Sequence, residues 1–164
     1  MALSIRPMRK RDIERVYEIE VQSFRTPWSK ASLMGELKNR VARYLLLEED
    51  GSVAAYGGMW VLYEESHMTN IAVAPEYRGR GYGRILFFAM MAEAQKRGAS
   101  QMTLEVRETN TVAQNLYYSL DFEKQGYRKR YYEDTGEGAY LLWNRDIAAT
   151  VAKNACIQEK YALK

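Results

Sequence analysis

A short basic, glycine-rich segment carries the clearest chemical signal in this sequence. It consists of Arg78, Gly79, Arg80, Gly81, Tyr82, Gly83 and Arg84. An apolar, strand-like stretch precedes it and a stretch with helical periodicity follows it. The first N–H groups of a helix lack acceptors inside the helix and therefore attract anions. Glycines allow the backbone to approach a phosphate closely, and arginines add charge-assisted hydrogen bonds. We therefore expect a diphosphate site here.

Two better-known nucleotide-binding motifs do not fit this segment. A P-loop requires Lys followed by Ser or Thr, whereas Gly83 is followed by Arg84 and Ile85. A dinucleotide-binding fold requires the spacing G-x-G-x-x-G, and here the glycines follow G-x-G-x-G. On the segment alone, a basic glycine-rich turn without a ligand remains the alternative.

The acid–base candidates are few. Glu105 lies between Leu104 and Val106 in an alternating stretch, so its side chain points away from theirs. It could line a cleft, where burial would raise its pKa provided that no cation offsets the effect. Alternatively, it is a surface glutamate paired with Arg107 or another arginine. We interpret His67, the only histidine, as structural rather than catalytic.

The composition indicates one soluble, folded domain. The chain has 164 residues, 47% hydrophobic and 27% charged, with a net charge of +3. With Cys156 as the single cysteine, an internal disulfide and a cysteine metal cluster are excluded, and we expect no metal. Charge precedes any apolar run at the start and no window resembles a membrane span, so we expect a cytoplasmic protein that does not contact a membrane.

Hydrophobic periodicity and turn residues predict alternating elements. We expect strands at 5–8, 41–48, 52–62, 68–73, 101–107, 122–132 and 139–144, and helices from 12, from 29, from 83 and from 110. Val21 and Phe24 are expected on the apolar face of the first helix. We expect a domain over 1–147 and a helical or frayed tail over 148–164.

This order of elements, with the glycine segment in the middle, resembles the GNAT acetyltransferase superfamily over roughly residues 3–146. Within it the sequence is most similar to the RimI family, which acetylates the N-terminal alanine of a ribosomal protein. Four stretches carry the resemblance: Phe24 to Ser29, Asn70 to Pro75, Leu104 to Arg107 with Asn110, and Asn115 to Phe122. The resemblance implies an α/β GNAT fold with a mixed, mostly antiparallel seven-stranded sheet, about four helices and acetyl-CoA as co-substrate.

The resemblance also implies roles for individual residues. Main-chain groups of Ile71, Ala72 and Val73 would contact the pantetheine arm, and segment 78–84 would hold the diphosphate. Asn110 would contact acetyl-CoA, although it is an equally good helix N-cap. Glu105 would be the general base and Tyr117 the general acid; Tyr117 could instead fill core volume. Trp28, Tyr131 and Tyr132 would line a peptide slot, or could equally be core.

The implied reaction is acetyl transfer to a protein N-terminal amine, specifically the N-terminal alanine of small-subunit ribosomal protein 18. An α-amine has a pKa near 8 against about 10.4 for lysine, so the neutral fraction favours the N-terminus by roughly a few hundredfold. Lysine or small-amine acetylation remains an alternative. A ribosome- or RNA-binding module using Arg128, Lys129 and Arg130 is another, although we expect no direct nucleic-acid binding.

One position departs from the family pattern. Asp121 stands where the family usually has glycine. If this position requires a left-handed backbone, Asp costs about 1 kcal/mol relative to Gly.

Overall fold

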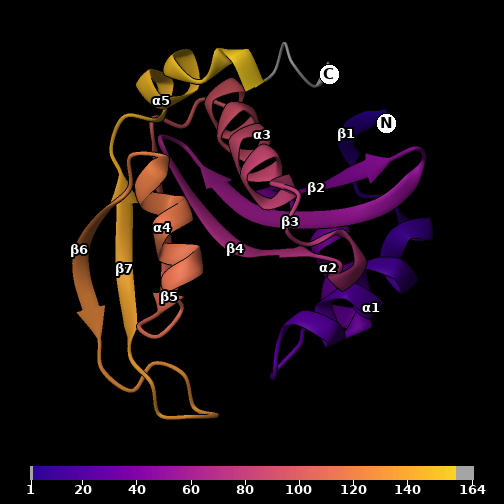
Figure 1. Cartoon of the computed structure of the whole chain (residues 1–164), viewed down its shortest axis with the longest axis horizontal. Helices are drawn as coiled ribbons and strands as arrows, with labels where there is room; N and C mark the ends of the chain where they lie inside the picture. The colour runs from indigo at the N-terminus through magenta and orange to yellow at the C-terminus, as the bar shows by residue number, and fades with distance from the viewer. Residues whose placement is uncertain (1, 158–164) are drawn as a thin grey trace.

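The computed structural model describes residues 2–157, and its centre is one seven-stranded sheet (Figure 1). The strands are β1 (Leu3–Pro7), β2 (Ala42–Glu49), β3 (Ser52–Leu62), β4 (Glu65–Val73), β5 (Gln101–Arg107), β6 (Glu123–Arg128) and β7 (Ala139–Asn144). They lie in the order β1-β2-β3-β4-β5-β7-β6, and β4 with β5 is the parallel pair among otherwise antiparallel neighbours. The predicted mixed, mostly antiparallel sheet is therefore confirmed.

Helices lie on both faces of the sheet (Figure 1). They are α1 (Ile13–Ser23), α2 (Lys30–Lys38), α3 (Tyr82–Lys96), α4 (Thr111–Ser119) and α5 (Ile147–Lys153), with short 3-10 turns at Lys10–Asp12 and Pro75–Tyr77. Alternate residues of β2 point to opposite faces: Leu45 and Leu47 join the core under α3, whereas Tyr44 and Leu46 join the core under α1 and α2. These two cores hold the sheet rigid around its middle strands.

Most predicted elements are present, with differences at their ends. The hairpin of β2 and β3 turns at Asp50 (φ 50°) and Gly51 (φ 84°), as the Asp-Gly pair predicts. Strand β4 begins three residues before the predicted position, and β6 ends at Arg128 rather than at residue 132. Val21 and Phe24 are exposed, so their predicted place on the buried face of α1 was wrong.

The fifth helix lies in the segment where a helical or frayed tail was expected. Helix α5 packs beside α3 (Figure 1), and its first residue, Ile147, is fully buried. Asp121 has the left-handed backbone considered above, with φ 66°. Its carboxylate accepts hydrogen bonds from the Thr150 hydroxyl and the Lys153 ammonium, both at 2.8 Å. Residues 158–164 of the predicted tail lie outside the described residues.

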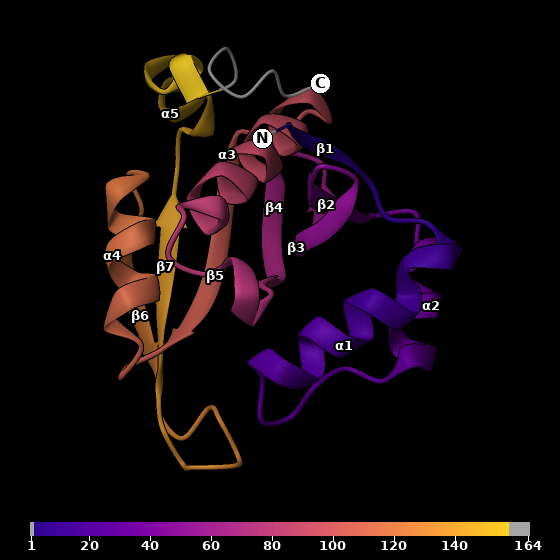
Figure 2. The same cartoon turned by 45° about the vertical axis from the view of Figure 1, so that its right-hand side comes forward.

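Strands β4 and β5 pair only at their beginnings. The register joins Glu65 with Gln101, Ser66 with Met102 and His67 with Thr103. Beyond these pairs the two strands diverge (Figure 2), and β5 continues alongside β7. Within the described residues, the edge of β4 from residue 68 to 73 therefore has no neighbouring strand on the β5 side.

Candidate active site

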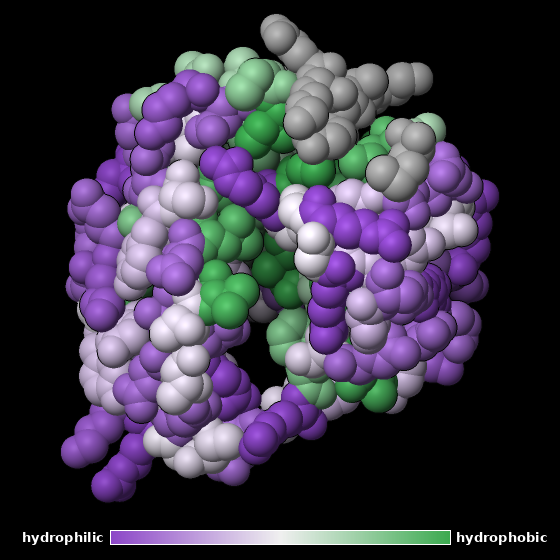
Figure 3. Space-filling model, in the orientation of Figure 1, coloured by the Kyte–Doolittle hydropathy of each residue, from purple (hydrophilic) through white to green (hydrophobic). Residues whose placement is uncertain are grey.

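A cleft opens between the two diverging parts of the sheet. Figure 3 shows it as a deep hollow with apolar side chains in its depth and hydrophilic side chains at its rim. The segments that border it are β4, the start of α3, β5 with α4, and the loop between β6 and β7 (Figures 1 and 2). Every one of these segments carries residues that the sequence analysis singled out.

The glycine segment connects β4 to α3 and presents unpaired main-chain donors. Gly79 and Gly81 have φ values of 80° and 79°, a left-handed conformation that favours glycine. The first hydrogen bond of α3 runs from the Ile85 N–H to the Gly81 carbonyl at 3.2 Å. In the described part of the chain, the N–H groups of residues 79–84 donate to no protein acceptor. This arrangement fits a diphosphate.

The arginine side chains of this segment contact the protein itself. Arg78 donates to the Val73 carbonyl at 3.0 Å, and Arg80 donates to a Glu49 carboxylate oxygen at 3.1 Å. Arg84 lies 3.5 Å from the Asn154 side-chain oxygen. The Tyr82 ring is buried and its hydroxyl also donates to Glu49. The main-chain donors, rather than these side chains, are thus the groups that are open to an anion.

Three residues expected to contact the pantetheine arm lie in the open half of β4. Ile71, Ala72 and Val73 pair on one side with Gly57, Tyr56 and Ala55 of β3. On the other side the edge faces the divergence from β5. An extended ligand could form main-chain hydrogen bonds along this edge, as an added strand does.

Glu105 is a largely buried carboxylate on β5, with 13% of its side chain exposed. Its Oε2 lies 2.7 Å from His67 Nε2, and its Oε1 lies 3.9 Å from Arg128 Nε. Burial acts to raise the pKa of Glu105, but the hydrogen bond and charge of His67, together with Arg128, outweigh burial and lower it. An upward shift was expected only if no cation offset burial, and His67 and Arg128 do offset it. The carboxylate is ionised at neutral pH.

Sequence reasoning did not anticipate the contact between His67 and Glu105. It is the last residue of β4 that pairs with β5, and its ring packs edge-on against Trp60 with centroids 6.1 Å apart. Glu105 lies two residues beyond its pairing partner Thr103, on a strand 38 residues later in the chain. Only the parallel register of β4 and β5 brings the two side chains together, and nothing local in the sequence indicates that register.

Tyr117 projects from α4 into the space between α3 and α4, with 8% of the residue exposed. Its ring packs against Phe87 and Phe122, with centroids 5.1 and 6.1 Å away. Within residues 2–157 its hydroxyl has no hydrogen-bond partner. Burial, with a smaller contribution from Tyr132, raises the pKa of Tyr117 to about 12, so it stays a phenol at neutral pH. It can therefore donate a hydrogen bond. Asn110 caps this helix by accepting from the Ala113 N–H at 3.2 Å.

The proposed peptide-slot residues come from two separate loops. Tyr131 and Tyr132 follow β6, and their rings meet at 90° with centroids 5.0 Å apart. Burial raises the pKa of Tyr132 to about 12, and the nearby charge of Glu105 contributes to that increase. The two tyrosines thus lie near the carboxylate. Trp28 belongs to the loop between α1 and α2, where it is half-buried.

A second buried carboxylate, which the sequence analysis did not single out, holds the Trp28 loop. Glu20 on α1 is 1% exposed. It accepts hydrogen bonds from the Trp28 N–H at 2.8 Å, from the Asn70 amide at 3.4 Å and from the Tyr56 hydroxyl. The Glu20 side chain therefore ties the α1–α2 loop to β3 and β4. Glutamate at a helical position whose neighbours are apolar is the only sequence signal for it.

Within residues 2–157, no group of three or more His, Cys, Asp or Glu side chains is placed to hold a metal ion. None of the helices described is long and apolar enough to cross a membrane.

The chain belongs to the acetyltransferase (GNAT) family, whose family model matches residues 13–122. It is thus an acetyl-CoA-dependent N-acetyltransferase. A Bacillus subtilis (strain 168) protein, named as a candidate ribosomal protein bS18-alanine N-acetyltransferase, is 43% identical over 141 residues, covering 85% of this chain and 93% of that protein. The Haemophilus ducreyi ribosomal protein bS18-alanine N-acetyltransferase is 38% identical over 125 residues, covering 75% and 84%.

Comparison of structures gives the same result. The ribosomal-protein-S18-alanine N-acetyltransferase from Escherichia coli superposes with a TM-score of 0.80 and 31% identity, covering 86% of this chain and 92% of that protein. The predicted GNAT fold and the resemblance to the RimI family are therefore confirmed.

Proposed function

We propose that this chain transfers the acetyl group of acetyl-CoA to the N-terminal alanine amine of ribosomal protein bS18, by direct attack of the amine with Glu105 as general base and Tyr117 as general acid. The observation that carries the site assignment is an ionised, largely buried carboxylate at the point where β4 and β5 part. The names of the relatives support the acceptor. An acceptor on the ribosome also supports a cytoplasmic location.

In this proposal the chain's main-chain groups bind the co-substrate. The free N–H groups of residues 79–84 hold the diphosphate, and the open edge of Ile71, Ala72 and Val73 accompanies the pantetheine arm. Bound acetyl-CoA supplies a thioester that is reactive toward amines. Asn110 keeps its capping hydrogen bond to the Ala113 N–H and lies at the N-terminus of α4, a helix that borders the cleft.

Two side chains handle protons. The acceptor must lose a proton before its nitrogen can attack, and Glu105 is ionised and positioned by His67 to receive it. The departing thiolate needs a hydrogen-bond donor, and Tyr117 remains protonated, with a hydroxyl that has no partner among the described residues. A carboxylate whose pKa is lowered is a weak base, and it is better matched to an α-amine near pKa 8 than to lysine.

The first experiment separates the possible acceptors. Two peptides are incubated with enzyme and acetyl-CoA and analysed by mass spectrometry: one has a free N-terminal alanine and no lysine, and the other has a blocked N-terminus and one lysine. We expect acetylation of the first alone. Modification of the second alone would replace the proposal with lysine acetylation, and modification of neither would move the search to small amines.

A variant tests the base. Glu105→Gln should lower kcat by about 10²- to 10⁴-fold, the usual contribution of a general base, with little change in acetyl-CoA affinity. Glu65→Gln, on the neighbouring strand and outside the contacts of Glu105, is the matched control. Wild-type turnover in Glu105→Gln would refute the assignment.

A further inference from the structure

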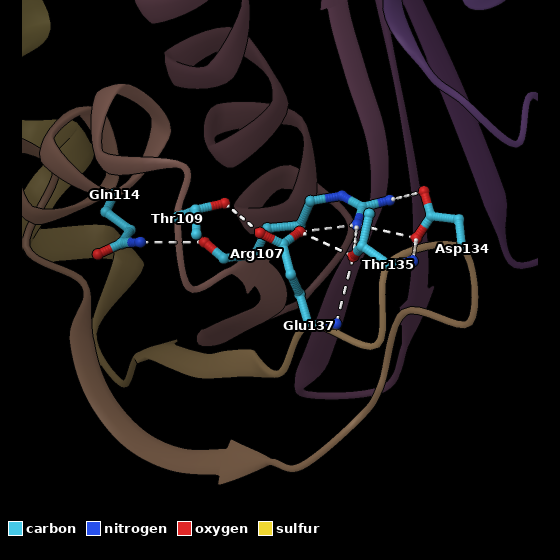
Figure 4. Close-up of polar contacts among 6 residues, drawn as sticks. All are labelled: Arg107, Thr109, Gln114, Asp134, Thr135 and Glu137. Carbon is cyan, nitrogen blue, oxygen red and sulfur yellow. Dashed lines mark hydrogen bonds and ion pairs between the residues drawn. The ribbon is translucent and has the colours of Figure 1, made fainter.

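Arg107 makes the densest set of polar contacts near the cleft. It is the last residue of β5, two positions after Glu105. Its guanidinium donates to both Asp134 carboxylate oxygens, at 3.0 and 2.8 Å, to Glu137 at 3.0 Å and to the Thr135 hydroxyl at 3.2 Å (Figure 4). All three partners belong to the loop that joins β6 to β7.

The same arginine also contacts the proposed peptide slot. Its guanidinium carbon lies 4.0 Å from the centre of the Tyr132 ring, a cation–π geometry. The Tyr132 ring in turn packs edge-on against Tyr131. Arg107 therefore contacts the acidic residues of the loop directly and the aromatic pair through Tyr132.

Hydrogen bonds from α4 in turn fix the main chain at the end of β5. The Gln114 amide of α4 donates to the carbonyl of Arg107 at 3.0 Å (Figure 4) and to the carbonyl of Glu108, also at 3.0 Å. The Thr109 hydroxyl donates to Glu137, which gives the loop a second attachment. The end of β5, the start of α4 and the β6–β7 loop therefore form one connected polar unit.

We propose that Arg107 is a positioning residue that clamps the β6–β7 loop, residues 129–138, over Glu105 and thereby holds Tyr131 and Tyr132 in place for the acceptor peptide. This inference rests on the proposed function for its kinetic consequence but not for the clamp itself. Because the strand that carries the base also carries the clamp, movement of the loop relative to Glu105 is restricted directly.

Arginine suits this task better than lysine. A planar guanidinium can bind the two Asp134 oxygens side by side, reach Glu137 with the same nitrogen and stack on Tyr132. An ammonium group keeps the charge but cannot make the paired bonds and the stacking contact together. Arg107→Lys therefore removes the geometry of the clamp and retains its charge.

Arg145→Lys is a matched control. Arg145 follows the other end of β7, donates to Gln101 at 2.8 Å and to Gln125 at 2.9 Å, and lies 3.9 Å from the centre of the Trp143 ring. It thus resembles Arg107 in its hydrogen bonds and stacking, but it is not attached to the β6–β7 loop.

Limited trypsin digestion tests the clamp without substrates. Lys129 and Arg130 are cleavage sites inside the loop. In Arg107→Lys, cleavage after these residues should be faster than in wild type and in Arg145→Lys. Equal rates in all three proteins would overturn the proposal. The double variant Asp134→Asn, Glu137→Gln removes the loop-side charges and the paired carboxylate acceptors, and it should reproduce the faster cleavage, which covers the case of an Arg107 variant that does not fold.

Steady-state kinetics with the alanine peptide tests the consequence. Loss of the clamp should raise KM for the peptide by about tenfold to a hundredfold, as displaced positioning groups do, with a smaller fall in kcat and an unchanged Kd for acetyl-CoA. An unchanged peptide KM together with faster cleavage would overturn the positioning role. If the wild-type protein acetylates no alanine peptide, the proposed function fails, while the trypsin result still decides the clamp.

Discussion

Replacement of Glu20 by glutamine gives a stability test whose size can be worked out from the contacts. Both carboxylate oxygens accept hydrogen bonds: one from Trp28 N–H, the other from Tyr56 and Asn70. The glutamic acid side chain has two oxygens in either protonation state, whereas glutamine has one oxygen and one NH₂ group, so at least one of these donors loses its acceptor. A buried donor left unsatisfied costs about 1–3 kcal/mol. We expect Glu20→Gln to lower the free energy of unfolding by that amount at about pH 5.

The pH dependence of the difference has a definite sign. Burial raises the pKa of Glu20 above its ordinary 4.5, so its contribution to stability is complete below pH 4.5 and is lost as pH rises through the raised pKa. Glutamine does not titrate. The gap in unfolding free energy between wild type and Glu20→Gln should therefore narrow as pH rises above about 4.5.

Urea unfolding followed by circular dichroism measures both quantities. Glu18→Gln is the control, because Glu18 lies on the same helix, its side chain is 57% exposed and it pairs with Arg15. This surface change should alter stability by less than about 0.5 kcal/mol. Coincident unfolding curves for the two variants at about pH 5, or a gap that widens as pH rises, would refute the account of Glu20.

Three other predictions concern the site and its surroundings. His67→Leu removes the donor that lowers the pKa of Glu105, so the acid limb of the pH profile of kcat/KM should move to higher pH; an unmoved limb would contradict the contact. Gly81→Ala places a side chain at φ 79°, a cost of about 1–2 kcal/mol, and should weaken acetyl-CoA binding measured by calorimetry while the protein stays folded. Asp121→Gly removes backbone strain along with two hydrogen bonds, whereas Asp121→Ala loses the bonds and keeps the strain. Thermal unfolding should find the alanine variant less stable by about 1 kcal/mol or more, and equal stabilities would show that φ at this position carries no strain.

The sequence predicted the elements whose signals are local. The Asp-Gly turn, the Ser29 and Asn110 caps and the alternation of 101–107 each depend on a few neighbouring residues, and each is present. The end of β6 was misplaced because Tyr131 and Tyr132 have high strand propensity. Their contacts with Arg107 and with each other place them in a loop instead.

The site depends on contacts between distant segments, and these were predicted less well. Glu105 was identified, but the direction of its pKa shift depends on His67 and Arg128, which reach it from β4 and β6. Arg107 was considered as its ion partner, whereas the structure pairs Arg107 with Asp134 and Glu137. Strand alternation places side chains on one face of the sheet but does not specify what they contact. Neither the direction of the Glu105 pKa shift nor the partners of Arg107 could therefore be predicted from it.

The short pairing of β4 with β5 links the stability of the folded protein to the binding of its co-substrate. Three residue pairs join the two parts of the sheet, and on the proposed binding mode acetyl-CoA lies along the edge that β5 leaves open. A ligand that binds only the folded chain adds about 2.7 kcal/mol of stability at a concentration a hundred times its Kd. On the proposed binding mode, the stability of the enzyme would then rise and fall with the supply of its own co-substrate.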